Sequence, residues 1–363
     1  MPTIALEMER LRNPYSGLGQ YCLQLGRAFA TEGSVERLGF VCLVPAAFVG
    51  EFGDRMQYKV VKPWHKLLGP SFGESLWHCM HQDSEFLPRS RKTLLAMTIH
   101  DLNFLDRPDY SAAKKSRRLG ALQQKINRSK GLVYISDFVQ KKVREHLKVP
   151  VGTVEQVIYN GGSVEPLELR DKLPIVSSQL QKIKDLGPFL FSIGIHPKKN
   201  YHILLPILAE FKEYQWVIAG PDSRGYQASI EAEAVKYGVS DRVIFCGPVD
   251  DVLKVEYYQH CKALLFPSLS EGFGLPVVEA MSLGKPVFLS DLTSLPEIGG
   301  EEAYYFRDFE PQTLIETFGS GMKDFASDPD KPVRMQQWAT RFSWKKAADQ
   351  YLEFYHKLLI NNN

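Results

Sequence analysis

Short apolar segments alternate with longer amphipathic segments along the whole chain. The apolar segments are four to six residues long and rich in β-branched and aromatic residues, which predicts strands. The predicted strands are Thr3–Glu7, Leu38–Leu43, Leu94–Ile99, Leu132–Ile135, Val154–Ile158, Phe189–Ile193, Trp216–Ala219, Val243–Cys246, Ala263–Phe266 and Pro286–Leu289. Helical periodicity fills the intervals, as in Gly19–Thr31, Phe138–Leu147 and Ile203–Phe211. Strands that alternate with helices are typical of α/β proteins, in which helices cover both faces of a parallel sheet.

The alternation runs in two series, and we therefore predict two doubly wound, Rossmann-like domains. A chain of 363 residues is too long for one ordinary core and suits two domains of about 150 residues each. Asn160-Gly161-Gly162 closes one strand, and the polar, strand-poor segment after it predicts the boundary. We expect domains at 1–168 and 188–343, a linker at 169–187, and a last helix within 344–363 that packs back on the first domain.

Composition adds little beyond a globular, cytoplasmic expectation. Lys+Arg (44) nearly balance Asp+Glu (42), so bulk charge does not indicate a nucleic-acid partner. The N-terminal residues do not resemble a secretion signal, and no apolar run reaches the ~18 residues that span a bilayer. The five cysteines are scattered and form no CxxC pair, which favours a reduced compartment. They are Cys22, Cys42, Cys79, Cys246 and Cys261.

The clearest chemical signal is the segment from Phe266 to Met281, which reads FPSLSEGFGLPVVEAM. It follows a predicted strand, its glycines allow backbone amides to approach a ligand, and Pro276 suits the first position of a helix. A strand, a glycine loop and a helix N-terminus together form an anion site, since free amides and the helix dipole face the ligand.

Two carboxylates flank this loop, Glu271 before it and Glu279 within the helix. A carboxylate beside a diphosphate is electrostatically unfavourable unless it holds neutral hydroxyl groups, which donate well to carboxylate oxygens. The pair therefore predicts hydroxyl clamps at the two ends of a sugar nucleotide. The alternative is an ordinary loop glutamate together with a helix N-terminal charge.

With Glu271 and Glu279 in EGFGLPVVEAM, the chain resembles glycosyltransferase family 4, of GT-B architecture. Further segments match the family's pattern across nearly the whole sequence: Asn160-Gly161, Gly220-Pro221, Gly247, Gly284-Lys285-Pro286-Val287, Ser294-Leu295-Pro296-Glu297 and Phe342-Ser343-Trp344. The resemblance implies two Rossmann-like domains facing across a cleft. It implies that the second domain holds the donor, through the Phe273, Gly274 and Leu275 backbone among others, and that the first holds the acceptor.

A second candidate segment is Gly194-Ile195-His196-Pro197-Lys198-Lys199-Asn200, directly after a predicted strand. Ligands of open α/β sheets bind beyond the carboxyl ends of strands. In the family a basic pair here contacts the donor phosphates, and Lys199 matches its lysine. Lys198 stands where many relatives have arginine, and lysine lacks the bidentate fork of arginine. The alternative is a solvated loop.

In the first domain, Gly17 and Gly19 lie between the first strand and its helix. A dinucleotide-binding fingerprint is disfavoured, because Cys22 occupies its third glycine position and no acidic residue ends the next strand. The resemblance implies that this loop faces the donor phosphates, and a plain tight turn is the alternative. His100, at the end of Leu94–Ile99, resembles the family's histidine near the transferred sugar. Asp101 either orients that imidazole or caps the next segment.

Retention of anomeric configuration is implied by the resemblance alone. The working mechanism is same-face attack, with the acceptor proton passing to a leaving phosphate oxygen. We expect Glu271, Lys199 and His100 at the reacting centre, and Glu279 on the ribose. None of the motifs quoted above contains a D-x-D, so we expect neither a metal nor another cofactor besides the nucleotide sugar.

A basic stretch covers Ala113–Lys130 and contains no acidic residue. Its first four cations are Lys114, Lys115, Arg117 and Arg118. Such a stretch suits anionic lipid headgroups or a lipid-linked acceptor, and a solvated helix face explains it equally well. A peripheral position on the inner face of the cell membrane follows only from the first interpretation.

We therefore predict a hexosyltransferase that modifies a glycan or lipid-linked acceptor in bacterial lipopolysaccharide or polysaccharide synthesis. Similarity to mannosyltransferase-like members slightly favours GDP-mannose over UDP- and ADP-linked sugars. The alternative is a non-catalytic sugar-nucleotide or glycan binding protein on the same fold.

Overall fold

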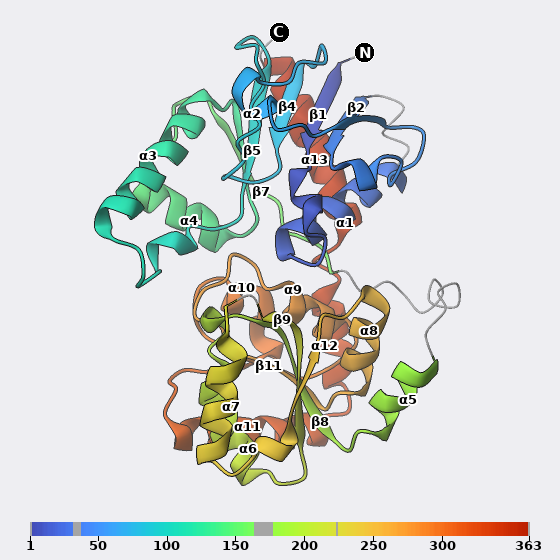
Figure 1. Ribbon diagram of the computed structural model, residues 1–363, viewed down its shortest axis with the longest axis vertical. Helices are drawn as coiled ribbons and strands as arrows, with labels where there is room; N and C mark the ends of the chain where they lie inside the picture. The colour runs from blue at the N-terminus through green and yellow to red at the C-terminus, as the bar shows by residue number, and fades with distance from the viewer. Residues whose placement is uncertain (1, 32–37, 163–176, 223, 362–363) are drawn as a thin grey trace. The chain divides into compact units, whose positions relative to one another are not determined.

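The computed structural model describes residues 2–31, 38–162, 177–222 and 224–361. The chain divides into two compact units (Figure 1). The first unit combines Met1–Gly161 with Phe342–Asn363, and the second is Gly162–Arg341. The second unit is thus inserted in the sequence of the first.

The first unit contains a seven-stranded parallel sheet with the strand order β3-β2-β1-β4-β5-β6-β7. Its strands are β1 (Thr3–Glu7), β2 (Gly39–Val44), β3 (Gln57–Val60), β4 (Leu76–Cys79), β5 (Leu94–Ile99), β6 (Gly131–Tyr134) and β7 (Val154–Val157). Its helices are α1 (Gly17–Thr31), α2 (His65–Leu68), α3 (Ala112–Arg128), α4 (Asp137–His146) and α13 (Trp344–Asn361). The strand order reverses direction between β1 and β4, which makes this the switch point of a doubly wound sheet.

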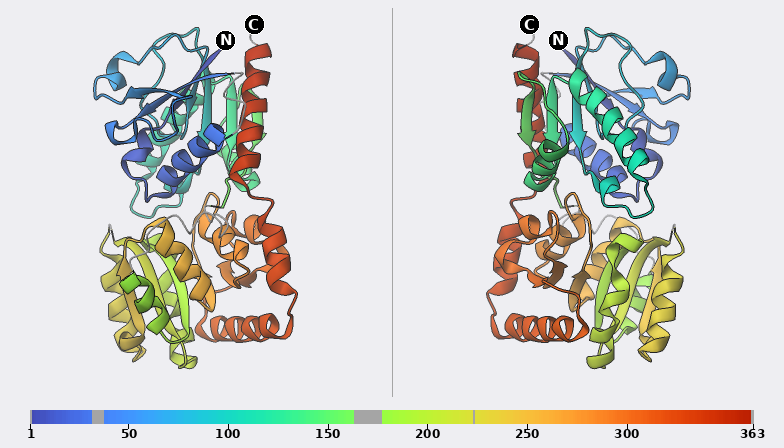
Figure 2. Two further views of the ribbon diagram at one scale, coloured as in Figure 1. Left: turned by 90° about the vertical axis from the view of Figure 1, so that its right-hand side faces the viewer. Right: turned by 90° about the vertical axis from the view of Figure 1, so that its left-hand side faces the viewer.

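Helix α13 is built into the core of the first unit beside α1 (Figure 2). Tyr351 and Tyr355 are fully buried on its inner face. The Tyr351 hydroxyl lies 2.7 Å from the Tyr21 hydroxyl of α1, and the Tyr355 hydroxyl lies 2.7 Å from Nδ1 of His78 on β4. Thr98 of β5 completes this network, 2.8 Å from Nε2 of His78. The polar side-chain atoms of these five residues are therefore satisfied by one another, as buried polar atoms require.

The second unit contains a six-stranded parallel sheet with the order β10-β9-β8-β11-β12-β13. Its strands are β8 (Phe189–Ile195), β9 (Gln215–Asp222), β10 (Val243–Gly247), β11 (Ala263–Phe266), β12 (Val287–Ser290) and β13 (Tyr304–Phe306). Its helices are α5 (Ser177–Asp185), α6 (Leu205–Glu210), α7 (Tyr226–Lys236), α8 (Asp251–His260), α9 (Leu275–Ser282), α10 (Leu295–Gly299), α11 (Pro311–Ser327) and α12 (Lys331–Ala339). Numbered from β8, this is the 3-2-1-4-5-6 order of the Rossmann fold, with the switch point between β8 and β11.

The expected fold class, two Rossmann-like domains with parallel sheets, is confirmed. All ten expected strands are present; three have the expected ends, and the ends of the others differ by at most three residues. Three further strands were not expected: β3, β4 and β13. They are only three or four residues long, and β3 is largely exposed at a sheet edge. The expected linker lies partly outside the described residues, and its described part contains α5.

Candidate active site

The loop after β8 is a tight turn that presents two lysines. His196 Nδ1 accepts a hydrogen bond from the Lys198 backbone amide at 3.1 Å, Pro197 begins a short 3-10 helix, and Asn200 ends it in the left-handed region with φ 59°. Gly194 has φ 89°, and a Cβ there would lie 3.3 Å from Cε of Lys199. The turn therefore fixes the backbone positions of Lys198 and Lys199.

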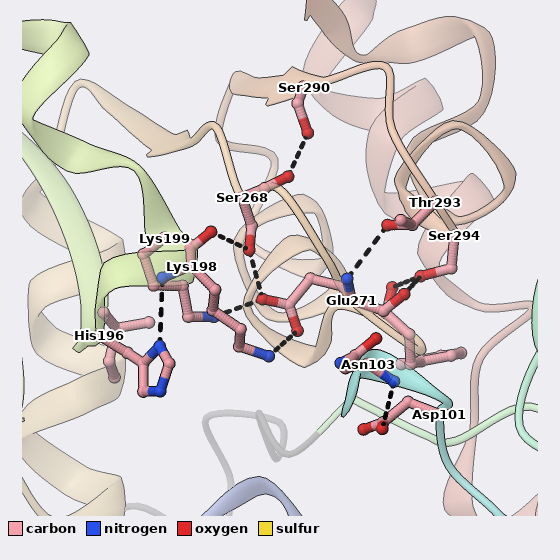
Figure 3. Close-up of polar contacts among 12 residues, drawn as sticks. Asp101, Asn103, His196, Lys198, Lys199, Ser268, Glu271, Ser290, Thr293 and Ser294 are labelled. Carbon is pink, nitrogen blue, oxygen red and sulfur yellow. Dashed lines mark hydrogen bonds and ion pairs between the residues drawn. The ribbon is translucent and has the colours of Figure 1, made fainter. Parts of the chain in front are cut away.

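Lys198 and Lys199 converge on Glu271 (Figure 3). Lys199 Nζ lies 2.8 Å from Oε1 of Glu271, and Lys198 Nζ lies 3.1 Å from Oε2. The Ser268 hydroxyl donates to the same Oε1 at 2.7 Å. The lysines follow β8 and Glu271 follows β11, so the cluster lies at the switch point of the sheet, where open α/β sheets bind ligands.

The charges of this cluster depend on one another. Burial alone would raise the pKa of Glu271, but the attraction of Lys198 and Lys199 outweighs burial and lowers the pKa to about 2. Burial lowers the pKa of Lys199 to about 8, although Glu271 opposes that shift. Glu271 is therefore ionised at neutral pH. Lys199 is still protonated there, but it loses its proton at only slightly alkaline pH.

The glycine loop after Glu271 is fixed from both sides. The Glu271 amide donates to the Thr293 hydroxyl at 3.1 Å, and the Ser294 hydroxyl lies 2.9 Å from the Phe273 carbonyl oxygen (Figure 3). Gly274 has φ 111°, and a Cβ there would lie 2.9 Å from Leu295 Cδ2. The loop leads directly into α9, whose first residue is Leu275. Pro276, expected at the first helical position, is the second residue of the helix.

Glu279 lies on α9, is 3% exposed, and receives two side-chain hydrogen bonds. Lys254 Nζ of α8 lies 2.9 Å from Oε1, and the Tyr258 hydroxyl donates to Oε2 at 2.8 Å. Lys254 also lies 3.1 Å from Asp251 Oδ1. The sequence interpretation missed Lys254 and Tyr258. The available signal was their i, i+4 spacing, which places both on one face of a helix.

The first unit holds the other expected site residues. A Cβ on Gly17 would meet no atom within 4 Å, whereas a Cβ on Gly19 would lie 2.0 Å from the Asn13 carbonyl oxygen. The turn therefore leaves no room for a side chain at position 19, whereas a Cβ at position 17 would meet no neighbouring atom. The expected roles of both residues toward a donor remain predictions.

His100 is buried at the end of β5, and its Nε2 lies 2.8 Å from the Met80 carbonyl oxygen. Burial lowers the pKa of His100 to about 4, so the ring is neutral at physiological pH. A carbonyl oxygen only accepts, so the proton must be on Nε2 and Nδ1 carries the lone pair. The imidazole is thus oriented by Met80. Asp101 caps the following turn, because its Oδ1 accepts from the Asn103 amide at 3.0 Å (Figure 3).

Comparisons with known proteins identify the class. Residues 177–342 match the family model described as glycosyl transferases group 1. The second unit matches this family over nearly its whole length. The glycosyltransferase is 24% identical to the O-antigen chain mannosyltransferase B of Escherichia coli, over 98% of this chain and 100% of the relative. It is 31% identical to the serotype-specific mannosyltransferase WbdA of Escherichia coli, over 50% of this chain and 24% of that longer protein.

Solved structures share the whole fold of this glycosyltransferase. Sucrose-phosphate synthase from Thermosynechococcus elongatus superposes with a TM-score of 0.73 at 18% identity, covering 99% of this chain and 100% of that one. Anabaena HepE in complex with UDP and glucose gives a TM-score of 0.70 at 17% identity, covering 97% and 98% of the two chains. Both comparisons support the GT-B architecture.

The basic stretch of the glycosyltransferase is helix α3, and several of its cations have partners from other segments. Arg118 pairs with Asp83 at 2.7 Å. Lys125 donates to the Gln82 and Ser84 carbonyl oxygens, and Lys114 lies over the Tyr110 ring. Part of the basic charge is thus compensated from outside the helix, which its own sequence did not show. Within the described ranges, no helix is long and apolar enough to cross a bilayer.

Proposed function

We propose that this glycosyltransferase is a retaining hexosyltransferase that transfers mannose from GDP-mannose to a glycan or lipid-linked acceptor. The observation that carries the proposal is the Lys198–Lys199–Glu271 cluster at the switch point of the second sheet. It combines cations suited to a diphosphate with a carboxylate suited to sugar hydroxyls. Named relatives that are O-antigen mannosyltransferases support mannose as the sugar and polysaccharide or lipopolysaccharide as the product.

Counting hydrogen-bond positions indicates how a donor enters this cluster. A carboxylate offers about four acceptor positions. Lys198, Lys199 and Ser268 occupy three of them on Glu271. A donor diphosphate attracts both lysines, and each lysine that turns toward it releases a position on Glu271 for a sugar hydroxyl. Donor binding therefore exchanges ion pairs within the cluster without burying an unpaired charge, which would be costly.

In the proposed mechanism, the bond between the anomeric carbon and the diphosphate oxygen breaks as the acceptor oxygen bonds to the same face of that carbon. The acceptor proton passes to the leaving phosphate oxygen, so charge and atoms balance within the two substrates. Lys199, with amides of the Phe273–Leu275 loop, stabilises the growing negative charge on the diphosphate. Glu271 holds hydroxyls of the transferred sugar, and Glu279 holds the ribose.

The mechanism assigns charge neutralisation to lysines, so we also propose that turnover needs no metal ion. The decisive assay follows GDP release and mannosyl product from GDP-mannose with EDTA present, using the purified protein and a lipopolysaccharide-type acceptor. Retained turnover is expected, and loss that Mg²⁺ or Mn²⁺ restores would refute metal independence. Product with α configuration at the new linkage is expected, because GDP-mannose is an α-linked donor.

The proposal as a whole is tested by slow hydrolysis of the donor without acceptor. Glu271→Gln is expected to lower this rate by about 10²–10³, and Lys62→Gln, an exposed lysine of the other domain, should leave it unchanged. Tight nucleotide binding with neither hydrolysis nor transfer would favour a sugar-nucleotide binding protein instead.

We further propose that α3 contacts anionic membrane surfaces through Lys114, Lys115 and Arg117. The first turns of this helix carry clustered positive charge, and a juxtamembrane cation near an anionic surface is worth about 1 kcal/mol. Sedimentation with phosphatidylglycerol vesicles at low salt tests this position. If the wild type and a Lys114→Gln, Lys115→Gln, Arg117→Gln variant are recovered equally in the pellet, α3 is not the membrane contact.

A further inference from the structure

Lys254 is a buried cation between two acidic side chains of the second domain. It lies on α8, is 7% exposed, and its Nζ is 2.9 Å from Glu279 Oε1 and 3.1 Å from Asp251 Oδ1. Asp251 precedes it by three residues, so both project from the same face of the helix. That face is the one that α8 presents to Glu279 on α9.

The ion pair keeps Lys254 charged despite its burial. Burial alone would lower the pKa of Lys254, but the attraction of Glu279 and Asp251 outweighs burial and raises the pKa. The side chain of Asp251 is 44% exposed, whereas that of Glu279 is 4% exposed. The lysine therefore connects a buried carboxylate with one that reaches solvent.

The hydrogen bonds to Glu279 leave part of the acceptor capacity of its carboxylate unused. Lys254 uses one acceptor position on Oε1, and Tyr258 uses one on Oε2. A carboxylate offers about four positions, so one position remains on each oxygen. Two acceptors held side by side match the two hydroxyl groups of a vicinal diol, such as the 2′- and 3′-hydroxyls of a ribose.

We propose that Lys254, together with Tyr258, is a positioning residue that holds Glu279 with one acceptor position per oxygen open to the ribose diol of a nucleoside diphosphate. The inference rests on the proposed function, because it needs a nucleotide at Glu279. Lys254 itself does not touch the ribose in this arrangement. Without it, the Glu279 carboxylate loses its charge partner and turns toward other donors or water.

The competing interpretation is that Lys254 only fastens α8 to α9. The two interpretations differ in which nucleotides are affected by a substitution. A fastening role predicts equal weakening for every nucleotide. A positioning role predicts a loss confined to nucleotides that carry the ribose hydroxyls.

The test compares the binding of GDP and 2′,3′-dideoxy-GDP by calorimetry. The variants are wild type, Lys254→Met, Glu279→Gln and Lys236→Met, the last being a control lysine that is exposed on α7 and paired with Glu233. Wild type and the control are expected to prefer GDP by about tenfold or more, the value for one charge-assisted hydrogen bond. Lys254→Met and Glu279→Gln should bring that preference close to one, while binding of the dideoxy nucleotide changes by less than about threefold.

An unchanged GDP preference in Lys254→Met, with both nucleotides weakened equally, would overturn the proposal. If Lys254→Met does not fold, Asp251→Asn and Tyr258→Phe decide the question, since each removes one contact of the same network. An intact preference in both of these variants would likewise overturn it. A wild type that binds none of GDP, UDP and ADP would instead overturn the proposed function and this inference with it, whereas preference for UDP or ADP only changes the nucleotide pair to be used.

Discussion

Lys199 and Glu271 form a partly buried ion pair of 2.8 Å although 72 residues separate them in sequence. The pair joins the loops that follow the two central strands on either side of the switch point, β8 and β11. In doubly wound sheets this is where the loops separate to make room for a ligand. The charge of Lys199 is thus neutralised within the cluster.

Activity should fall as the pH rises above about 8. The pKa of Lys199 is lowered to about 8 because burial disfavours its ammonium form, and in the proposed mechanism the neutral amine cannot compensate the donor phosphates. The profile of kcat/KM for the donor reports the pKa of the free enzyme, so its alkaline limb should lie near pH 8. The limb for kcat should lie higher, because bound diphosphate favours the cation.

Lys199→Arg provides the control for that assignment. Arginine stays charged well above pH 10, so the alkaline limb of kcat/KM should disappear even if the maximal rate falls. An identical limb in wild type and Lys199→Arg would assign the titration to another group.

Gly17→Ala and Gly19→Ala should separate an effect on activity from an effect on folding. A Cβ at Gly19 would lie 2.0 Å from a backbone oxygen, so this variant should lose stability by about 1–3 kcal/mol. A Cβ at Gly17 meets no atom within 4 Å, so this variant should unfold at the wild-type urea concentration. If Gly17 approaches the donor phosphates, Gly17→Ala should nevertheless raise the donor KM, and a wild-type KM would exclude Gly17 from the donor site.

Tyr355→Phe should destabilise the first domain. The change leaves Nδ1 of the buried His78 without its 2.7 Å partner, and an unsatisfied buried polar group costs about 1–3 kcal/mol. Urea unfolding followed by circular dichroism measures the loss. Tyr15→Phe, at a tyrosine that is 65% exposed, should change the unfolding free energy by less than about 0.5 kcal/mol.

Glu7 should make the first domain less stable as the pH rises from about 4.5 to about 7. Burial raises the pKa of Glu7 from 4.5 to about 7 in the folded protein. The unfolded chain therefore releases this proton at lower pH than the folded one, so folding stability falls across that window and stays reduced above it. Relative to wild type, Glu7→Gln should gain on the order of 1–3 kcal/mol between pH 4.5 and pH 8. A constant difference between the two proteins across this range would contradict the titration.

The sequence was sufficient for the fold class because the strands that carry it are apolar and separated by clear helical periodicity. It did not reveal β4, although this strand is central and fully buried, since Leu-Trp-His-Cys is short and contains a polar residue. The His78 side chain in β4 is satisfied by Thr98 and Tyr355, residues distant in sequence. Hydrogen bonds between residues that are far apart in sequence cannot be recognised from the local sequence pattern.

For the candidate site, the sequence likewise indicated individual residues but not all of the contacts between them. The sequence indicated Glu271, Glu279, Lys198 and Lys199 from their loops, and the structure brings the two lysines onto Glu271. It did not indicate that Glu279 is paired with Lys254, because a single lysine on a helix is usually solvated. Which charge neutralises which carboxylate depends on how α8 packs beside α9, and spacing along the chain does not determine that.

The last helix has a consequence for synthesis of the protein. Residues of α13 fill the core of a domain whose other strands and helices lie within the first 161 residues. A ribosome must therefore complete the entire inserted domain before the first-made domain receives its final core element. The inserted domain becomes the first one able to finish folding on the nascent chain, and the N-terminal segment lacks its final core helix until α13 has been translated.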